Sequence, residues 1–204
     1  MIIAQQKRKE SIVEYLLYMW QVEDLIRANH LNMAQIEKTI ISKYSSTTPE
    51  QQQAIHDWWD NLTEMMRIEK KEENGHLQIT KALMDDVYNY HLYLLTQNTE
   101  IAYQNAFQNA WPDLNVLQSK IKDGDKMHHI ELALNAIYDY FLLKLQNKTI
   151  LADTTNALMR ISHFMAMLSS RYLKAEKELE KELSTNTDGT LNQTKQQPTR
   201  KLPN

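Results

Sequence analysis

Three charged residues stand within the apolar arc of the first strongly helical segment, which we predict over residues 6–28. Glu23, Asp24 and Arg27 share that arc with apolar side chains such as Trp20. Residues four apart face each other on a helix, so Glu23 and Arg27 are predicted to form an ion pair. Because a buried charge is costly unless it is paired, this group could form the polar floor of a small-ligand pocket. We favour the simpler interpretation, an ion pair that fixes the helix or a point where the arc meets solvent.

His91 lies at the centre of the apolar arc of another predicted helix, residues 77–97, on the same side as Thr80. An imidazole in that position could bind a ligand or act as a general base. A core histidine that bonds to a carbonyl or hydroxyl group is more common, and we favour that interpretation. The ligand hypothesis requires His91 and the charged group of the first helix to converge in one cavity.

The remaining polar pairs indicate solvated surface. Asp85 and Asp86 are adjacent, so their side chains point about 100° apart on a helix. His56 and Asp60 share a helix face, but two ligands do not make a metal site, and we predict neither a metal nor a cofactor. The chain has no cysteine and only 3 glycines, which excludes disulfides, thiolate chemistry and glycine-rich phosphate loops. Three further histidines are expected on the surface: His128, His129 and His163.

The composition is typical of a protein built from long helices. The chain has 204 residues, of which 42% are hydrophobic, with only 3 Gly and 4 Pro to punctuate turns. The net charge of −3, with both signs mixed along the chain, disfavours a nucleic-acid partner. No run of about 18 apolar residues is present and the N-terminal residues lack the pattern of a signal peptide, so we expect a cytoplasmic protein with no membrane partner.

We predict one all-α domain over residues 1–183, a single bundle of five to seven helices. The segment 6–28 is apolar almost all round, which is typical of a helix surrounded by others, and we expect it to be central. Residues 184–204 are polar and are expected to be a disordered tail. The other helices are predicted over residues 32–44, 49–73, 77–97, 112–122 and 126–146, and from residue 153 onward.

Three local signals mark helix boundaries. Thr48 is a good N-cap, with Pro49 at the first helical position and Gln51 completing a capping box. Helices often end just before a residue in the left-handed conformation, which glycine adopts easily. Gly75 is therefore predicted to follow the end of a helix. Pro112 is expected to stop any helix that continues beyond residue 97.

The last predicted helix carries a heptad seam. Apolar side chains recur at spacings of three and four through three repeats, at Leu158, Ile161, Met165, Leu168, Tyr172, Ala175 and Leu179. Its end, residues 174–183, is almost entirely Lys, Glu, Ala and Leu and is expected to project as a solvated helix. The leading hypothesis is therefore a non-enzymatic interaction protein that forms a homodimer through this helix. The alternative is a small-ligand- or metal-binding bundle, or an enzyme, with a site around Glu23, Arg27 and His91. RNA binding is a weaker third hypothesis.

The opening segment, residues 6–28, reads QKRKESIVEYLLYMWQVEDLIRA. It resembles the domain-of-unknown-function family 4924, which consists of small proteins from Bacteroides and related bacteria. We expect the resemblance to cover residues 1–183. It implies a bacterial cytoplasmic protein without an assigned activity, and it supplies no catalytic or ligand-binding residues.

Overall fold

Helices account for most of the chain that the structure describes. The computed structural model describes the backbone of residues 2–44, 48–121 and 124–193, and within those ranges no strand occurs. The protein is therefore all-α, as predicted. The α-helices are α1 (Ile2–Glu10), α2 (Ile12–Ala28), α3 (Met33–Thr39), α4 (Pro49–Ile68), α5 (Gln78–Thr96), α6 (Ile101–Lys120), α7 (His129–Leu145) and α8 (Ala152–Gln193), and two short 3₁₀ helices are η1 (Ile41–Lys43) and η2 (Gly124–Lys126).

The described residues form eight α-helices rather than the predicted five to seven, because the predicted helix over residues 6–28 is interrupted at Ser11. Ser11 is extended (φ −159°, ψ 121°) and its hydroxyl accepts the backbone N–H of Glu14 at 3.2 Å. A serine hydroxyl competes for backbone donors in this way, and it therefore favours helix starts over helix interiors. Ser169 of α8 lies 3.0 Å from the same hydroxyl and also accepts the N–H of Ile12 at 3.1 Å. These hydrogen bonds at the interruption connect the start of α2 to α8.

Helix α2 is central, as its apolar sequence predicts. Nine of its 17 residues are buried: Ile12, Val13, Leu16, Leu17, Met19, Trp20, Val22, Glu23 and Ile26. Ile12, Leu16 and Trp20 belong to a large core that includes residues of α5, α6, α7 and α8. Met19 and Ile26 face a smaller core built with α3 and α4. The architecture is therefore two hydrophobic cores that share one helix, which differs from the predicted single bundle.

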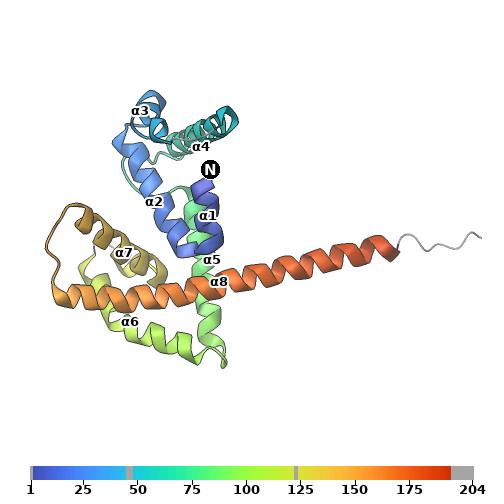
Figure 1. Cartoon of the computed structure of the whole chain (residues 1–204). Coiled ribbons are helices and arrows are strands. Elements are labelled where there is room, and N and C mark those ends of the chain that lie inside the picture. The colour runs from blue at the N-terminus through green and yellow to red at the C-terminus, as the bar shows by residue number, and fades with distance from the viewer. Residues whose placement is uncertain (1, 45–47, 122–123, 194–204) are drawn as a thin grey trace, which may run out of the picture.

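Figure 1 shows how these cores are arranged. The helices α3 and α4 stand apart from the body at the far end of α2, while α6 and α7 lie along the first part of α8. The second part of α8 leaves the body entirely. At 1.5 Å per residue, the 42 residues of α8 span about 63 Å.

Helix boundaries follow the local signals in some places and not in others. The capping box of Thr48 and Gln51 is present, with Gln51 N–H donating to the Thr48 hydroxyl at 3.3 Å and Thr48 N–H donating to the Gln51 side chain at 3.1 Å. The helix that it starts ends at Ile68, earlier than predicted, and residues 69–77 form a loop. Pro112 lies inside α6 instead of ending a helix. Its ring is exposed, so water can solvate the carbonyl group that loses its N–H partner.

Helix α8 continues to Gln193, so the backbone of residues 184–193 is helical where a disordered tail was expected. The rest of that expected tail, residues 194–204, lies outside the described residues. No helix in the described part of the chain is both long enough and apolar enough to cross a membrane.

Candidate functional site

Glu23 is buried, with 1% of its surface exposed, and both of its carboxylate oxygens accept hydrogen bonds. Oε2 lies 2.6 Å from Nδ1 of His76, while Oε1 accepts the N–H of Leu77 at 3.2 Å and the hydroxyl of Thr80 at 3.0 Å. These three groups belong to the start of α5, where Leu77 offers no side-chain cap of its own. A carboxylate at a helix N-terminus satisfies orphan N–H groups and interacts favourably with the helix dipole. Glu23 therefore caps α5 from a neighbouring helix.

Arg27 does not pair with Glu23, so the predicted ion pair is wrong. Its guanidinium instead bonds to Asp24 at 2.7 Å, donates to the carbonyl of Lys71 at 3.0 Å and donates to the carbonyl of Gly75. Gly75 has φ +80°, the left-handed conformation that its sequence position predicts. The two carbonyl acceptors belong to the loop between α4 and α5. Arg27 therefore connects that loop to α2.

Two aromatic residues complete this polar cluster, and sequence reasoning missed both. The His76 ring stacks on Trp20 with centroids 4.2 Å apart, and the Tyr138 hydroxyl donates to Asp24 at 2.6 Å. Burial, followed by the bond to Asp24, raises the pKa of Tyr138. The turn at Gly75 was recognisable, but nothing in the sequence indicates that it brings His76 against Glu23. Each charged group of this cluster is already bonded within the chain, so the cluster has a structural role. We call the group Glu23, Asp24, Arg27, His76 and Tyr138 the clamp.

His91 lies elsewhere. It is fully buried, and its Nδ1 is 2.7 Å from the hydroxyl of Tyr103, as expected for a core histidine bonded to a hydroxyl group. Eleven residues of α5 separate it from Thr80, which corresponds to about 16 Å along the helix, so it does not join the Glu23 cluster. Burial, with smaller contributions from His129 and His128, lowers the pKa of His91 to about 4. Its ring is therefore neutral at physiological pH.

Two histidines near His91 are less exposed than the sequence predicted. His128 and His129 are half-buried rather than exposed, whereas His163 is exposed as predicted. The ring of Tyr88 stacks on His128 with centroids 4.2 Å apart, and the ring of His129 lies 5.8 Å from that of His91. Burial lowers the pKa of both half-buried histidines. No group of three or more potential metal ligands occurs among the residues that the structure describes.

The heptad seam of α8 divides into a covered part and an open part. Ile161, Met165 and Leu168 are buried in the chain's own large core, and Leu158 is also buried. Tyr172 and Ala175 are half-buried, and Leu179 is 57% exposed. Most of the seam is therefore used inside the molecule, and only its end faces solvent.

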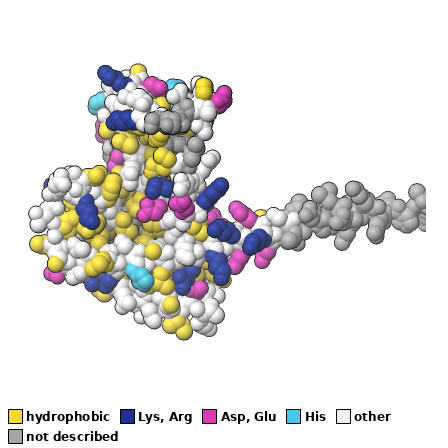
Figure 2. Space-filling view, viewed as in Figure 1, with side chains coloured by type: hydrophobic (Ala, Val, Ile, Leu, Met, Phe, Trp, Pro, Cys, Tyr) yellow, Lys and Arg dark blue, Asp and Glu magenta, His cyan; other side chains and the backbone are white. Residues whose placement is uncertain are grey.

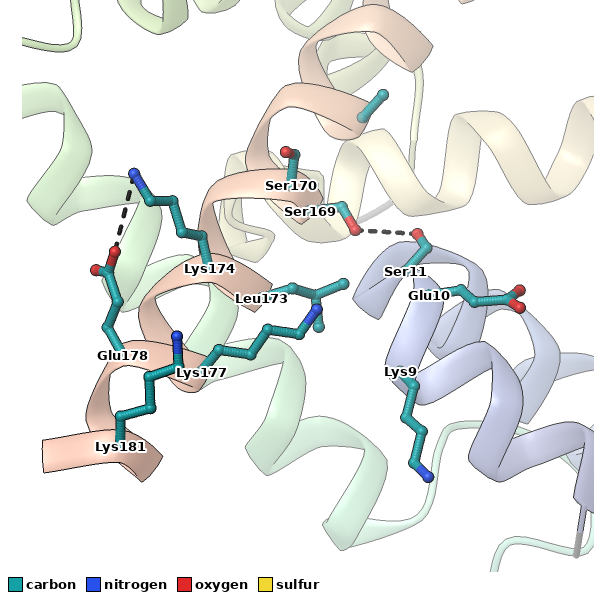
Figure 3. Close-up of a pocket in the computed structure, with 11 residues that line it drawn as sticks. Lys9, Glu10, Ser11, Ser169, Ser170, Leu173, Lys174, Lys177, Glu178 and Lys181 are labelled. Carbon is teal, nitrogen blue, oxygen red and sulfur yellow. Dashed lines mark hydrogen bonds and ion pairs between the residues drawn. The ribbon is translucent and has the colours of Figure 1, made fainter. Parts of the chain in front are cut away.

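A wide cleft of about 640 Å³ lies where α8 leaves the body, beside the junction of α1 and α2 (Figure 3). Lysines from α1 and α8 line it together with glutamates, and Lys174 pairs with Glu178 at 3.8 Å. The hydrogen-bonded hydroxyls of Ser11 and Ser169 lie on one wall (Figure 3). Figure 2 shows side chains of both charges mixed in this region. Such exposed, mixed charges contribute little to binding, and we assign no role to the cleft.

A second depression, of about 350 Å³, lies between α6, α7 and the first turns of α8. Its walls are mainly apolar, with carboxylates at Asp113, Asp139 and Asp153. Asp113 is engaged by Arg160, through bonds of 2.7 and 2.9 Å. This depression, which we call the α6–α8 groove, contains none of the candidate site residues Glu23, Asp24, Arg27 and His91.

These features define the class of the protein: an all-α protein with a polar cluster whose charged groups are bonded within the chain, a projecting helix α8 and a mainly apolar groove beside its first turns. The chain belongs to the family described as domain of unknown function (DUF4924), whose model matches residues 1–179. That match bears out the family resemblance seen in residues 6–28. No curated protein and no solved structure matches the chain.

Proposed function

We propose that the protein is a non-enzymatic interaction module that forms a homodimer through the part of α8 beyond the body. The observation that carries this proposal is the exposure of two large apolar side chains there, Leu179 at 57% and Leu183 at 60%. Both lie on the segment that Figure 1 shows leaving the other helices. Exposed leucines of this kind on a projecting helix are typical of a surface that another helix covers.

The arrangement of the apolar side chains favours a second helix as the partner. At 100° per residue, Tyr172, Ala175, Leu179 and Leu183 fall within about 80° of one another, which makes one narrow stripe. The stripe continues the seam that already packs against helices inside the body, so its spacing suits helix packing. An isolated helix is only marginally stable in water. Packing against another helix would therefore stabilise the projecting segment.

A second copy of the same chain is the occupant to which we commit. Closed twofold dimers are the commonest assemblies of soluble proteins, and each copy would bring an identical stripe. The charges permit such pairing, because residues 174–182 contain three lysines and four glutamates in alternation rather than a block of one sign. Repulsion between two copies is correspondingly small and is screened further by salt.

Light scattering coupled to size-exclusion chromatography tests the proposal over a range of protein concentrations. We expect the wild-type chain to approach the mass of a dimer as the concentration rises. The double variant Leu179→Glu/Leu183→Glu should remain at the monomer mass of 24.1 kDa. The matched control is Lys177→Glu, which changes the net charge by the same two units on the opposite face of α8 and should still dimerise. A wild-type monomer at every concentration would overturn the proposal.

The alternative of a ligand site around Glu23, Arg27 and His91 receives less support. Glu23 and Arg27 use their hydrogen-bonding groups within the chain, and His91 lies about three helical turns from the clamp. We also propose that the protein acts in the cytoplasm of a bacterium. A chain without cysteine is well suited to a reducing compartment.

A further inference from the structure

The α6–α8 groove combines an apolar floor with a concave shape. Leu158 and Ile161 of α8 are buried beneath it, and Leu117, Leu143 and Ala157 rise along its sides as half-buried residues. Its volume of about 350 Å³ lies at the small end of the range for small-molecule sites, about 300–1,000 Å³. The groove therefore has room for a compact apolar group of several carbon atoms.

Two of the three carboxylates at this groove, Asp139 and Asp153, have no hydrogen bond or ion pair among the described residues. Asp113, on the same groove, is held by both bonds from Arg160, and Asp153 is exposed at the first turn of α8. Asp139 differs from Asp153 in that neighbouring protein atoms partly desolvate its carboxylate, which raises its pKa. Lys120 is the one lysine that lines the groove, and no ion pair within 4 Å joins it to Asp139. Asp139 therefore remains available to a cation from outside.

The chemistry of Asp139 agrees with this placement. The residue is exposed at the rim, yet neighbouring protein atoms partly desolvate its carboxylate and raise its pKa, and no cation among the described residues counteracts that effect. A positive group beside the carboxylate would favour its charged form. Because Arg160 already neutralises Asp113, two carboxylates and one lysine remain on the lining, and this balance favours a cationic ligand over an anionic one.

We propose that the α6–α8 groove binds a small amphipathic cation, with its apolar part against Leu117, Leu143 and Ile161 and its protonated amine paired with Asp139. The site is distinct from the homodimer surface. Ile161 and Leu179 are 18 residues apart on α8, which corresponds to about 27 Å. Binding to the groove and self-association can therefore be tested independently.

Three probes of equal length separate the contributions of shape and charge: hexylammonium, 1-hexanol and hexanoate. Methyl resonances of Leu117, Leu143 and Ile161 are followed by NMR as each probe is titrated into the full-length protein at pH 7. We expect saturable shifts with hexylammonium, weaker binding of hexanol and the weakest binding of hexanoate. Equal affinity for the three probes, or no saturable shift at these methyl groups, would overturn the proposal.

Two variants and one control test which residues of the groove bind the probes. Asp139→Asn should weaken hexylammonium about fivefold and leave hexanol unchanged, since it removes one partly solvated ion pair. Ala157→Leu should weaken both probes, because the larger side chain narrows the groove. Asp60→Asn, on an exposed face of α4 away from the groove, should bind as wild type. Thermal melts of each variant show that it is folded, and an Asp139→Asn protein that is folded and keeps the wild-type preference for the amine contradicts the assignment.

Discussion

Glu23 of α2 and Asp139 of α7 are both carboxylates, yet their surroundings in the protein are opposite. Glu23 is buried and accepts hydrogen bonds from His76, Leu77 and Thr80. Asp139 stands at the rim of a cavity with no partner in the described chain. A carboxylate whose bonding capacity is fully used inside the chain serves the architecture, whereas one left without a partner beside a cavity is available for binding. The polar group that looks most unusual in the sequence is therefore the weaker candidate for function.

The largest expected effect comes from removing the satisfied carboxylate. Glu23→Ala leaves the Leu77 N–H and the Thr80 hydroxyl buried without an acceptor and takes away the cap of α5. We expect the free energy of unfolding to fall by about 3–5 kcal/mol. Urea unfolding followed by circular dichroism measures the change. A loss below about 1 kcal/mol would show that Glu23 is not a clamp, and the contrast with Asp139 would then disappear.

His91 is an intermediate case, since one ring nitrogen is bonded to Tyr103 and the other, Nε2, is buried without a partner. Its pKa falls from 6.5 to about 4 in the folded protein, mainly through burial. The unfolded chain therefore binds more protons than the folded protein between those two values. Stability is fully present above pH 6.5 and is lost as the pH falls through this window, by about 3 kcal/mol for His91 alone.

Unfolding free energies measured from pH 7 to pH 4 test this prediction. His91→Phe should reduce the dependence of stability on pH, although His128 and His129 will leave part of it because burial lowers their pKa values too. Replacing the exposed His163 with phenylalanine is the matched control for the removal of one imidazole. If wild type and His91→Phe lose stability equally over this range, His91 is not the principal group.

A smaller effect is expected at Ser11, where a satisfied hydroxyl lies near the surface rather than in the core. Ser11→Ala removes the cap of α2 and the contact with Ser169, and we expect a loss of about 1 kcal/mol in the free energy of unfolding. Ser162→Ala, at an exposed position of α8, is the matched control and should change little. Thermal and urea unfolding provide the measurement, and equal values for the two variants would contradict a capping role for Ser11.

Local signals predicted the fold better than they predicted the site. The apolar circumference of α2 and the capping box at Thr48 depend on nearby residues, and both are present in the structure. The break at Ser11 depends partly on Ser169, which is 158 residues away. The bonds of Glu23 and Arg27 likewise depend on a loop about 50 residues along the chain. Tertiary contacts of this kind leave no local pattern. Sequence reasoning paired Arg27 with Glu23, four residues away, whereas its carboxylate partner is Asp24, three residues away.

Asp139 could not be recognised from the sequence either, because only the packing of three helices makes it different from other surface aspartates. In the part of the chain that the structure describes, Asp139→Ala removes no hydrogen bond and leaves no buried group without a partner. We expect the free energy of unfolding to change by less than about 0.5 kcal/mol at pH 7. The raised pKa means that folding slightly disfavours the ionised carboxylate, so any small change at neutral pH should be stabilising. Urea unfolding beside Glu23→Ala makes the comparison direct, and a loss of 2 kcal/mol or more at Asp139 would place it among the structural carboxylates and remove the reason to look for a cation there.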